Sequence, residues 1–365
     1  MDSNFCGIYK GRKVFVTGHT GFKGSWLTYW LFKMGADVTG YSLPPPTKPN
    51  HFECINQKIT SITGDINNVV SLSNALTNSK AEIVFHLAAQ PLVRLSYINP
   101  FETYMTNVLG TLNLFEACRN SNTVRAIVAI TTDKVYDNKE WCWPYRENDP
   151  LGGYDPYSSS KACAEILITS YRNSFFNLER YGKNHKILLA SVRAGNVIGG
   201  GDWGQDRLIP DIMKSCSENK PVFIRNPKSI RPWQHVLDCL SGYLLVGQHL
   251  LQGNKEMATS FNFGPSLDAQ LTVEEVVLFV KKYWSSLEYC IQKSEDQLHE
   301  ANYLKLDCSK ARTMLFWQPI WNIEQALKHT VNWYKEYYEQ KKVLTEENLF
   351  AYVQDAKKQG VIWTK

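Results

Sequence analysis

Short apolar runs alternate with amphipathic stretches over the first half of the chain. The apolar runs predict strands at residues 14–17, 37–41, 61–64, 82–87, 124–131 and 186–192. Between them, apolar positions with helical spacing predict helices near residues 25–34, 69–78, 102–120 and 157–173. Strands and helices that alternate in this way indicate an α/β protein, with a doubly wound parallel sheet covered by helices on both faces.

A glycine-rich turn follows the first predicted strand and leads into a helix; it reads Thr17-Gly18-His19-Thr20-Gly21-Phe22-Lys23-Gly24. We expect Gly18 to allow the tight turn, Gly21 to let the backbone approach a pyrophosphate, and Gly24 to let the helix pack closely on the strand. N–H groups at the helix start would then face the anion. Such a turn can be a plain connection, but the strand before it and the helix after it favour a Rossmann-type dinucleotide site.

A second segment, Tyr157-Ser158-Ser159-Ser160-Lys161, lies on a predicted helix. Its phenol and its ammonium are one helical turn apart and share one face. A nearby cation favours the phenolate, so Tyr157 could act as a base near neutral pH. Tyr and Lys often share an exposed helix face for no catalytic reason. Together with a dinucleotide site, however, the pair points to nicotinamide-dependent chemistry on an alcohol.

After residue 193 the alternation ends in an irregular region with Gly199-Gly200-Gly201 and several prolines. Helical patterns follow at residues 272–284 and 323–340. We therefore expect two units. Residues 1–193 would form the Rossmann domain, to which the chain returns near 236–263. Residues 194–235 and 264–365 would form a smaller, mostly helical lobe that caps the carboxyl ends of the strands, where such folds bind ligands.

Composition narrows the class of protein. Of the 365 residues, 44% are hydrophobic and 21% charged, and the net charge is only +5, which is ordinary for a globular enzyme. We expect no nucleic-acid partner, because no Lys/Arg run is present, and no membrane span or signal peptide, because no long apolar run is present. The nine cysteines include no C-x-x-C pair, which favours reduced thiols in the cytoplasm over disulfides or a metal site.

Several motifs resemble the extended short-chain dehydrogenase/reductase superfamily, and within it the nucleotide-sugar 4,6-dehydratases. Besides the two segments above, the motifs are Phe85-His86-Leu87-Ala88-Ala89-Gln90, Thr131-Thr132-Asp133-Lys134-Val135-Tyr136, Arg193-Ala194-Gly195-Asn196-Val197-Ile198-Gly199-Gly200-Gly201-Asp202-Trp203 and Arg231-Pro232-Trp233-Gln234-His235-Val236. They span residues 14 to about 240 in the family's order, and the final third matches loosely. The Asp133-Lys134 pair is similar to the CDP-glucose 4,6-dehydratase branch.

The resemblance implies a reaction and its catalytic residues. Tyr157, aided by Lys161, would take the hydroxyl proton at carbon 4 of CDP-glucose while a hydride leaves for NAD. Thr132 would hydrogen-bond the carbon-4 oxygen. Water would leave across carbons 5 and 6 with Asp133 as the acid, and the hydride would return to carbon 6. The product would be CDP-4-keto-6-deoxyglucose, for deoxysugar and lipopolysaccharide biosynthesis.

Lys134 departs from the dTDP-glucose branch, where a Glu in this place removes the carbon-5 proton. A Lys can be the base only if its pKa falls, through burial or a neighbouring cation. Alternatively it only stabilises the enolate-like intermediate by its charge. Both roles stay open.

The cofactor residues expected from the turn and the resemblance are Gly18, Thr20, Gly21, Phe22, Lys23, Gly24, Asp65, Ile66, Leu87, Ala88, Ala89, Tyr157 and Lys161. NAD enzymes often carry an acid at the end of the second strand. This chain has Tyr41-Ser42 there, and no Arg for a 2′-phosphate, so NAD is inferred from the resemblance. Asp65 would approach the adenine; alternatively, it caps a helix.

The substrate residues implied by the resemblance are Arg94, Asn196, Arg207, Arg231 and His235. Arg207 and Arg231 would clamp the diphosphate, although a surface ion pair is the alternative for both. His235 could reach the substrate or make a structural hydrogen bond. The aromatic residues of the last helix are assigned to packing.

Two other functions remain in view. A 4-epimerase of the superfamily needs no acid at carbon 6, and Asp133 argues against it. A catalytically inactive NAD(P)-binding sensor need not keep Thr132, Tyr157 and Lys161. By analogy with the superfamily, the helices at 102–120 and 157–173 would form a four-helix interface in a homodimer or homotetramer.

Overall fold

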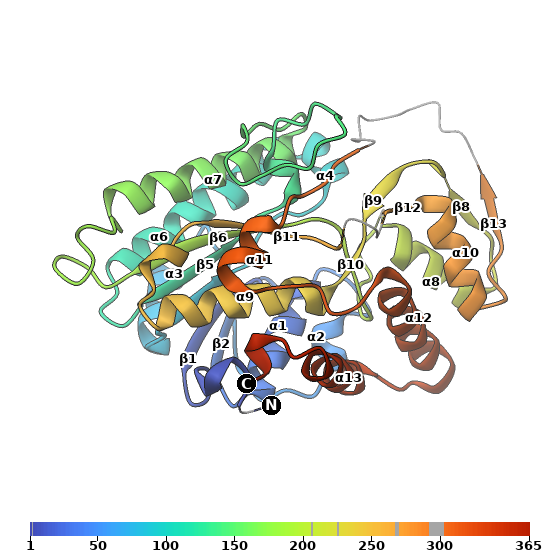
Figure 1. The fold of residues 1–365 in the computed structure, drawn as a ribbon, viewed down its shortest axis with the longest axis horizontal. Coiled ribbons are helices and arrows are strands. Elements are labelled where there is room, and N and C mark those ends of the chain that lie inside the picture. Colours follow the sequence, from blue (N-terminus) through green and yellow to red (C-terminus); the bar gives the residue numbers. More distant parts are fainter. Residues whose placement is uncertain (2, 206, 225, 267–269, 292–302) are drawn as a thin grey trace.

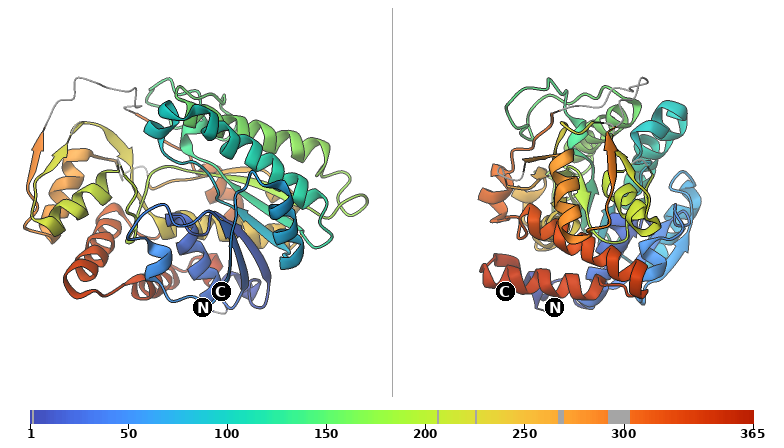
Figure 2. Two further views of the ribbon diagram at one scale, coloured as in Figure 1. Left: turned by 180° about the vertical axis from the view of Figure 1, so that it is seen from behind. Right: turned by 90° about the vertical axis from the view of Figure 1, so that its right-hand side faces the viewer.

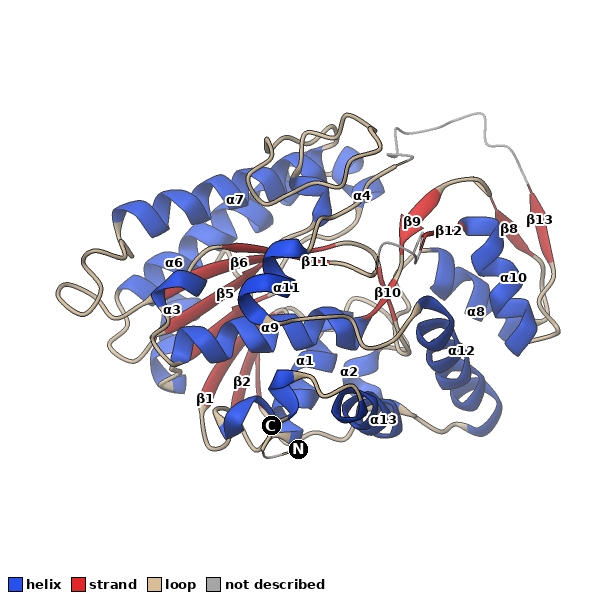
Figure 3. Ribbon diagram, viewed as in Figure 1, coloured by secondary structure: helices blue, strands red, loops and turns tan. Residues whose placement is uncertain are grey.

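The computed structural model describes the whole chain except residues 2, 206, 225, 267–269 and 292–302. A seven-stranded parallel sheet forms its centre, with the strand order β11-β6-β5-β4-β1-β2-β3 (Figures 1 and 3). The strands are β1 (Lys13–Thr17), β2 (Asp37–Ser42), β3 (Thr60–Thr63), β4 (Ile83–His86), β5 (Ala126–Ile130), β6 (Leu188–Ala194) and β11 (Ser260–Phe263). The predicted doubly wound sheet is confirmed, and all six predicted strands belong to it.

Alternate residues of the strands enter two separate apolar layers, as the period of two in a strand requires. Val14 and Val16 face α1 (Phe22–Lys33) and α9 (Val236–Leu251). Phe15 faces the opposite layer. That layer contains α3 (Val69–Ser79), α6 (Gly110–Arg119) and α7 (Pro156–Ser174). Because both faces are covered by helices, the central strands are apolar on both sides.

The predicted helix at 102–120 is one helical run with a π-turn in its middle. It consists of α5 (Pro100–Tyr104), the π-turn η2 (Met105–Leu109) and α6. Shorter elements beside the sheet are η1 (Asn4–Gly7), α2 (His51–Cys54), α4 (Val93–Ile98), η3 (Asp133–Val135) and η4 (Lys255–Met257). Among the described residues, no helix has the length and apolar character that crossing a membrane demands.

A second lobe lies at one end of the molecule and has its own apolar core (Figure 2). Its helices are α8 (Leu208–Glu218), α10 (Val273–Tyr283) and α12 (Ile323–Gln340). Short strand pairs accompany them: β7 (Val197–Ile198) with β10 (Gln234–His235), β8 (Val222–Ile224) with β13 (Tyr289–Ile291), and β9 (Ile230–Pro232) with β12 (Gln270–Thr272). Trp333 and Tyr334 of α12 are fully buried in this core, so the packing role predicted for the aromatic helix is confirmed.

The chain does return to the sheet after this lobe begins, through α9 and β11, and β11 pairs with β6. The predicted lobe boundary at 264 needs a correction, however. Core residues between 304 and 321 and between 349 and 363 pack with the first layer of the sheet. These segments contain α11 (Ser309–Leu315), most of α13 (Thr345–Lys358) and η5 (Ile362–Thr364). Aromatic anchors such as Trp317, Tyr352 and Trp363 draw them onto α1 and α9.

At Gly200 the lobe and the first unit are in close contact. A Cβ on Gly200 would lie 2.0 Å from Cγ of the buried Trp333, and the Gly200 carbonyl accepts a hydrogen bond from Trp26 of α1. The glycine therefore allows an aromatic side chain of the lobe to rest directly on backbone.

We expect Gly200→Ala to lower the free energy of unfolding by about 1–3 kcal/mol, because the added methyl overpacks a closed core. Urea unfolding followed by tryptophan fluorescence measures the change. Gly264→Ala is the matched control, since its Cβ would make only an ordinary contact of 3.4 Å with Cys308. Equal stabilities of the two variants would contradict the role assigned to Gly200.

Candidate active site

The glycine-rich turn joins β1 to α1 and has the geometry of a phosphate cradle. Gly18 has a φ of +74°, and a Cβ there would lie 2.7 Å from the backbone nitrogen of Ala88. A Cβ on Gly24 would lie 2.1 Å from the Gly18 oxygen. Gly21, by contrast, meets nothing closer than 3.4 Å. Helix α1 begins at Phe22, three residues earlier than predicted, so Gly24 lies in its first turn.

Gly21 is the N-cap of α1 and offers no side chain to the N–H groups of the first turn, which suits an anionic ligand. Thr20 fastens the turn to the end of β2, since its hydroxyl bonds the Leu43 carbonyl and the Ser42 hydroxyl at 2.9 Å each. Phe22 and Lys23 follow within the same turn of helix. The tight turn predicted at Gly18 and the close packing predicted at Gly24 thus have steric counterparts, while the approach of a pyrophosphate to Gly21 stays a prediction.

Residues that follow β3 and β4 complete the edge of this cradle. Asp65 is exposed after β3, and its carboxylate accepts from the backbone of Asn67, whereas Asn68 caps α3. The helix-cap alternative for Asp65 is therefore wrong. Ile66 is buried in the layer under α6, so its side chain cannot face a ligand. Leu87, Ala88 and Ala89 follow β4, and Thr17 holds the first two through its carbonyl and hydroxyl.

His86 is a fully bonded core residue. Its ring nitrogens contact the hydroxyls of Thr17 and Thr111 at 2.8 and 2.9 Å, and burial lowers its pKa to about 3. The neutral ring connects β1, β4 and α6 beneath the cradle. A narrow glycine turn, an uncapped helix start and the exposed Asp65 at a neighbouring strand end together fit a dinucleotide such as NAD.

Tyr157 stands in the first turn of α7, close behind its cap. Asp155 caps the helix through the Ser158 backbone, and the Tyr157 N–H donates to the buried Ser96 hydroxyl of α4 at 3.1 Å. The tyrosine is 8% exposed and shares a hydrogen bond with Thr132. Thr132 in turn donates to Asp133 at 3.0 Å. The end of β5 and the start of α7 thus bring Thr132, Asp133 and Tyr157 together.

Asp133 and Lys134 occupy η3, directly after β5. Asp133 is buried, and a Cβ on Gly195 would lie 2.7 Å from its Oδ2. Glycine at 195 therefore leaves room for the carboxylate beside the loop that carries Asn196. Lys134 is half-buried, and its backbone N–H is 3.4 Å from the Thr132 hydroxyl.

Lys161 was expected to lower the pKa of Tyr157, but other groups dominate that pKa in the structure. Burial raises the pKa of Tyr157 to about 12; Thr132 and Arg207 lower it, while Asp133 raises it. Lys161 donates to the Ile130 carbonyl at 3.2 Å, and burial with the charge of Lys23 lowers its own pKa to about 8. The cation that acts most on the phenol in this state is Arg207, a residue of the second lobe.

Arg207 precedes α8 and forms an ion pair with Asp202 at 2.8 Å, which raises its pKa. The ion pair given as the alternative for Arg207 is therefore present. The Arg207 guanidinium nevertheless lies close enough to Tyr157 to lower the pKa of the phenol. Arg94 lies on α4, two residues before the Ser96 contact with Tyr157, and is half-buried. Asn196 follows β6 and accepts from the Gln234 backbone through its carbonyl. Arg231 lies on β9, paired with Leu271.

His235 is enclosed by aromatic side chains. Its Nδ1 accepts from the Leu237 N–H at the start of α9, and its ring is fully buried against Trp26 and Trp321. Burial lowers its pKa well below the ordinary value. A direct contact with a substrate, as predicted, is not available to a ring enclosed in this way, so the structural hydrogen bond is the observed role.

Two features of the site escaped sequence reasoning. Asn107, in the π-turn, bonds both backbone groups of Gln90 and the Ser160 hydroxyl of α7. The apolar spacing of residues 102–120 predicts an unbroken helix, so it gives no signal for this turn; π-turns often occur at functional sites.

The second feature is a buried ion pair between α7 and β6. Glu165, one turn beyond Lys161, bonds Arg193 of β6 at 2.8 Å, with side chains 1% and 3% exposed. Burial alone would raise the pKa of Glu165, but Arg193 and the hydroxyls of Thr131 and Ser191 hold it below its ordinary value. Arg193 also donates to the Tyr136 hydroxyl and the Glu147 carbonyl. One guanidinium thus links α7, β6 and two points, Tyr136 and Glu147, of the segment between η3 and α7.

Among the described residues, no group of three or more His, Cys, Asp or Glu side chains is placed to hold a metal ion. The reactive groups at this edge of the sheet are a phenol, a buried carboxyl, two lysines and an arginine. They can move protons at a hydroxylated substrate placed beside the dinucleotide cradle.

In comparisons with known proteins, the chain matches nucleotide-sugar 4,6-dehydratases. The family of GDP-mannose 4,6 dehydratase matches residues 15–330. The CDP-glucose 4,6-dehydratase of Salmonella typhimurium is 53% identical, over 92% of this chain and 93% of that protein. The dTDP-D-glucose 4,6-dehydratase of Mus musculus is 26% identical over 89% of each chain.

Solved structures agree on the fold. An epimerase from Methanothermobacter thermautotrophicus has a TM-score of 0.79 at 23% identity, over 93% of this chain and 95% of that one. The dTDP-glucose 4,6-dehydratase of Bacillus anthracis, in complex with NAD, has a TM-score of 0.73 at 22% identity, over 90% and 98% of the two chains.

Removing one member of the Glu165–Arg193 pair leaves a buried charge without its partner. We expect Arg193→Met to lower the free energy of unfolding by about 3–5 kcal/mol, and the added change Glu165→Leu to restore much of that loss. Urea unfolding of both single variants and the double variant measures the coupling. If the double variant lost the sum of the two single effects, the pair would not be coupled.

Lys161 should weaken the fold near neutral pH, because its folded pKa of about 8 lies below the unfolded value. Wild-type stability then rises as pH increases through the interval from the folded pKa to the unfolded one. We expect Lys161→Met to add about 1–3 kcal/mol at pH 7, with the gain shrinking toward higher pH. Unfolding curves at several pH values test this, with the exposed Lys328→Met as control. A pH-independent loss of stability would contradict it.

Proposed function

Because the chain belongs to the GDP-mannose 4,6-dehydratase family, we propose that it converts CDP-glucose to CDP-4-keto-6-deoxyglucose. It is an NAD-dependent nucleotide-sugar 4,6-dehydratase, a carbon–oxygen lyase. The observation that carries the choice of substrate is the 53% identity to the CDP-glucose 4,6-dehydratase of Salmonella typhimurium over almost the full length of both chains.

NAD, when bound, supplies the acceptor for the carbon-4 hydride and gives that hydride back later in the cycle. The residues proposed to hold it are those of the cradle: the glycine turn with Thr20, Phe22 and Lys23, the strand ends with Asp65 and Leu87 to Ala89, and Tyr157 with Lys161. Ile66 is proposed to contact the cofactor only through its backbone, because its side chain is buried in the core.

The proton chemistry at carbon 4 is assigned to Tyr157 and Thr132. Thr132 holds the carbon-4 oxygen while Tyr157 accepts the hydroxyl proton. With a pKa of about 12, the phenol is protonated at neutral pH in the free protein, so its function as a base depends on positive charge nearby. Lys161 and Arg207 are the residues that supply that charge.

Elimination across carbons 5 and 6 is assigned to Asp133 and Lys134. Asp133 protonates the leaving hydroxyl, and glycine at position 195 leaves the space that its carboxylate occupies. Lys134 takes the carbon-5 proton or stabilises the resulting negative charge; both roles are compatible with its half-buried place after β5. Arg94, Asn196, Arg207 and Arg231 are proposed to bind the CDP-sugar, with the two latter arginines on its diphosphate.

The proposal extends to the assembly and the cellular setting of the enzyme. Helices α5 to α7 expose Phe101, Leu109 and Ile166, which are 72%, 41% and 59% exposed. Apolar side chains in such positions support a homodimer or homotetramer through these helices. The nine cysteines are free, which supports a reducing, cytoplasmic setting. A 6-deoxysugar nucleotide fits lipopolysaccharide biosynthesis.

Substrate deuterated at carbon 4 tests the function. CDP-glucose should give a 4-keto product that carries the deuterium at carbon 6, with no net release of NADH, and should be used better than dTDP-, UDP- and GDP-glucose.

Tyr157→Phe, which removes one oxygen, should lower turnover about 10²–10⁴-fold without loss of cofactor binding. Accumulating NADH would identify an ordinary dehydrogenase, and near-wild-type turnover of the variant would remove Tyr157 from the mechanism.

A further inference from the structure

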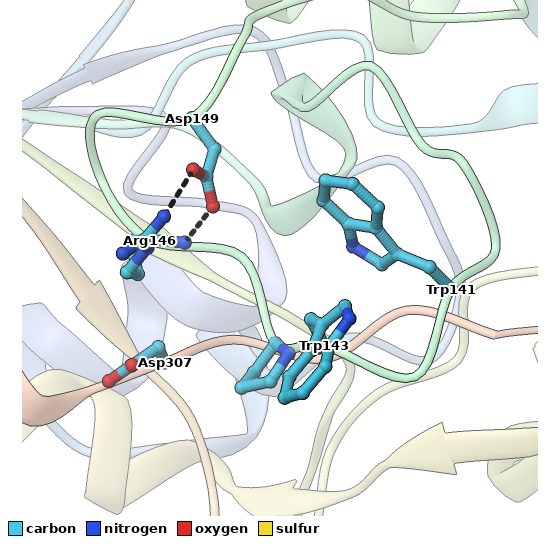
Figure 4. A pocket seen from close by; sticks show the side chains of 6 residues that line it. Trp141, Trp143, Arg146, Asp149 and Asp307 are labelled. Carbon is cyan, nitrogen blue, oxygen red and sulfur yellow. Dashed lines mark hydrogen bonds and ion pairs between the residues drawn. The ribbon is translucent and has the colours of Figure 1, made fainter.

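A hollow of about 320 Å³ lies beside the segment that joins η3 to α7 (Figure 4). Its described walls are Trp141, Trp143, Pro144, Arg146, Asp149 and Asp307. None of these six residues is among the catalytic, cofactor or substrate candidates. Its volume is at the lower end of ligand pockets, which span about 300–1,000 Å³, so it suits one small ring.

Two indoles dominate the hollow and are unusually open for such large apolar side chains. Trp141 is 41% exposed and Trp143 is 68% exposed. Apolar surface gathered in one place on a protein exterior marks a binding site more often than chance exposure does. In Figure 4 the two indoles line the hollow on the side away from Asp149. A ligand with an apolar face is therefore favoured.

Trp141 is held in place before any ligand arrives. Its ring stacks on Tyr145 at 5.5 Å, Tyr145 stacks on Tyr136 at 5.0 Å, and the Arg193 guanidinium lies 5.1 Å from the Tyr136 ring. Tyr145 is buried and accepts from the Lys139 backbone at 2.7 Å. Binding to this wall costs little side-chain entropy, since the indole is already ordered.

The polar groups of the hollow are an arginine and two carboxylates. Asp149 binds the backbone and the side chain of Arg146, at 2.8 and 3.3 Å. Asp307 accepts from the Ser309 backbone at 2.7 Å. A guanidinium has five donors and a carboxylate about four acceptor sites, so both can bond a ligand as well. One cation against two carboxylates leaves a net negative charge, which disfavours phosphates and other anions.

We propose that this hollow binds a neutral hexopyranose ring. The C–H face of such a ring covers an indole, and its hydroxyls accept from Arg146 and donate to Asp307. A neutral hexopyranose meets all three conditions set by the hollow, which are an apolar face, mixed hydrogen-bonding edges and no negative charge. The ring can be a free sugar or a unit of a glycan. The proposal does not rest on the function given above.

Titration of the full-length protein with methyl α-glucoside, followed by saturation-transfer NMR and by tryptophan fluorescence, tests the site. Trp143→Ala should weaken binding about tenfold or more, a change of roughly 1.4 kcal/mol. Asp307→Asn should weaken it less. Both variants should dehydrate CDP-glucose at the wild-type rate. Phe350→Ala, which removes a ring that is 56% exposed from α13, is the matched control and should bind normally.

Three results would overturn the proposal. The first is no binding of methyl α-glucoside by the wild-type protein. The second is its displacement by CDP, which would place the sugar in the nucleotide-sugar site. The third is preferential binding of tetramethylammonium, which would make the hollow a cation site. Maltotriose separates the two sources: tighter binding than the monosaccharide supports a glycan, and equal binding supports a free sugar.

Discussion

The interaction on which the catalytic end of the molecule depends is the buried Glu165–Arg193 ion pair. Its partners leave little of either charge unbonded: Thr131 and Ser191 bond the carboxylate, and Tyr136 and the Glu147 carbonyl bond the guanidinium. Burying two charges is costly unless such bonds compensate it. The arrangement therefore fixes α7 on the sheet at one rotation and one height. Tyr157 and Lys161 take their positions from that helix, and Thr132 and Asp133 from the strand end beside it.

A second constraint is steric and acts through missing side chains. Gly18, Gly24, Gly195 and Gly200 each let backbone or a side chain approach to a distance that a methyl group would block. Two of these contacts form the dinucleotide cradle. Gly195 leaves room for the Asp133 carboxylate, and Gly200 leaves room for Trp333 of the second lobe. Charge thus sets the orientation of α7, while glycine sets how closely the turn after β1, the Asp133 carboxylate and the second lobe pack against their neighbours.

The sequence predicted what depends on local pattern. Apolar spacing found the six strands and the long helices, and the glycine spacing found the cradle, because both arise from neighbours in the chain. What it missed depends on contacts between distant residues. The return of α11 and α13 to the first layer is driven by Trp317, Tyr352 and Trp363, whose partners lie far away in sequence. Of the two roles open for His235, the ring packed against Trp26 and Trp321 leaves the structural hydrogen bond. The charge acting on Tyr157 was expected from Lys161, its neighbour on the helix, whereas Arg207, distant in sequence, is the cation that lowers the pKa of the phenol in this structure.

The π-turn at Asn107 has a consequence for how this chain can change in length. A π-turn contains one residue more than the α-helical turn it replaces. Deleting a single residue between 105 and 109 would therefore produce a more regular helix from residue 100 to 119. Because the π-turn absorbs the extra residue, α5 and α6 keep their orientations after such a deletion. What the deletion removes is the local widening that places Asn107, whose side chain bonds both backbone groups of Gln90 and the Ser160 hydroxyl. The extra residue thus joins the loop after β4 to α7 without changing how α6 packs in its layer.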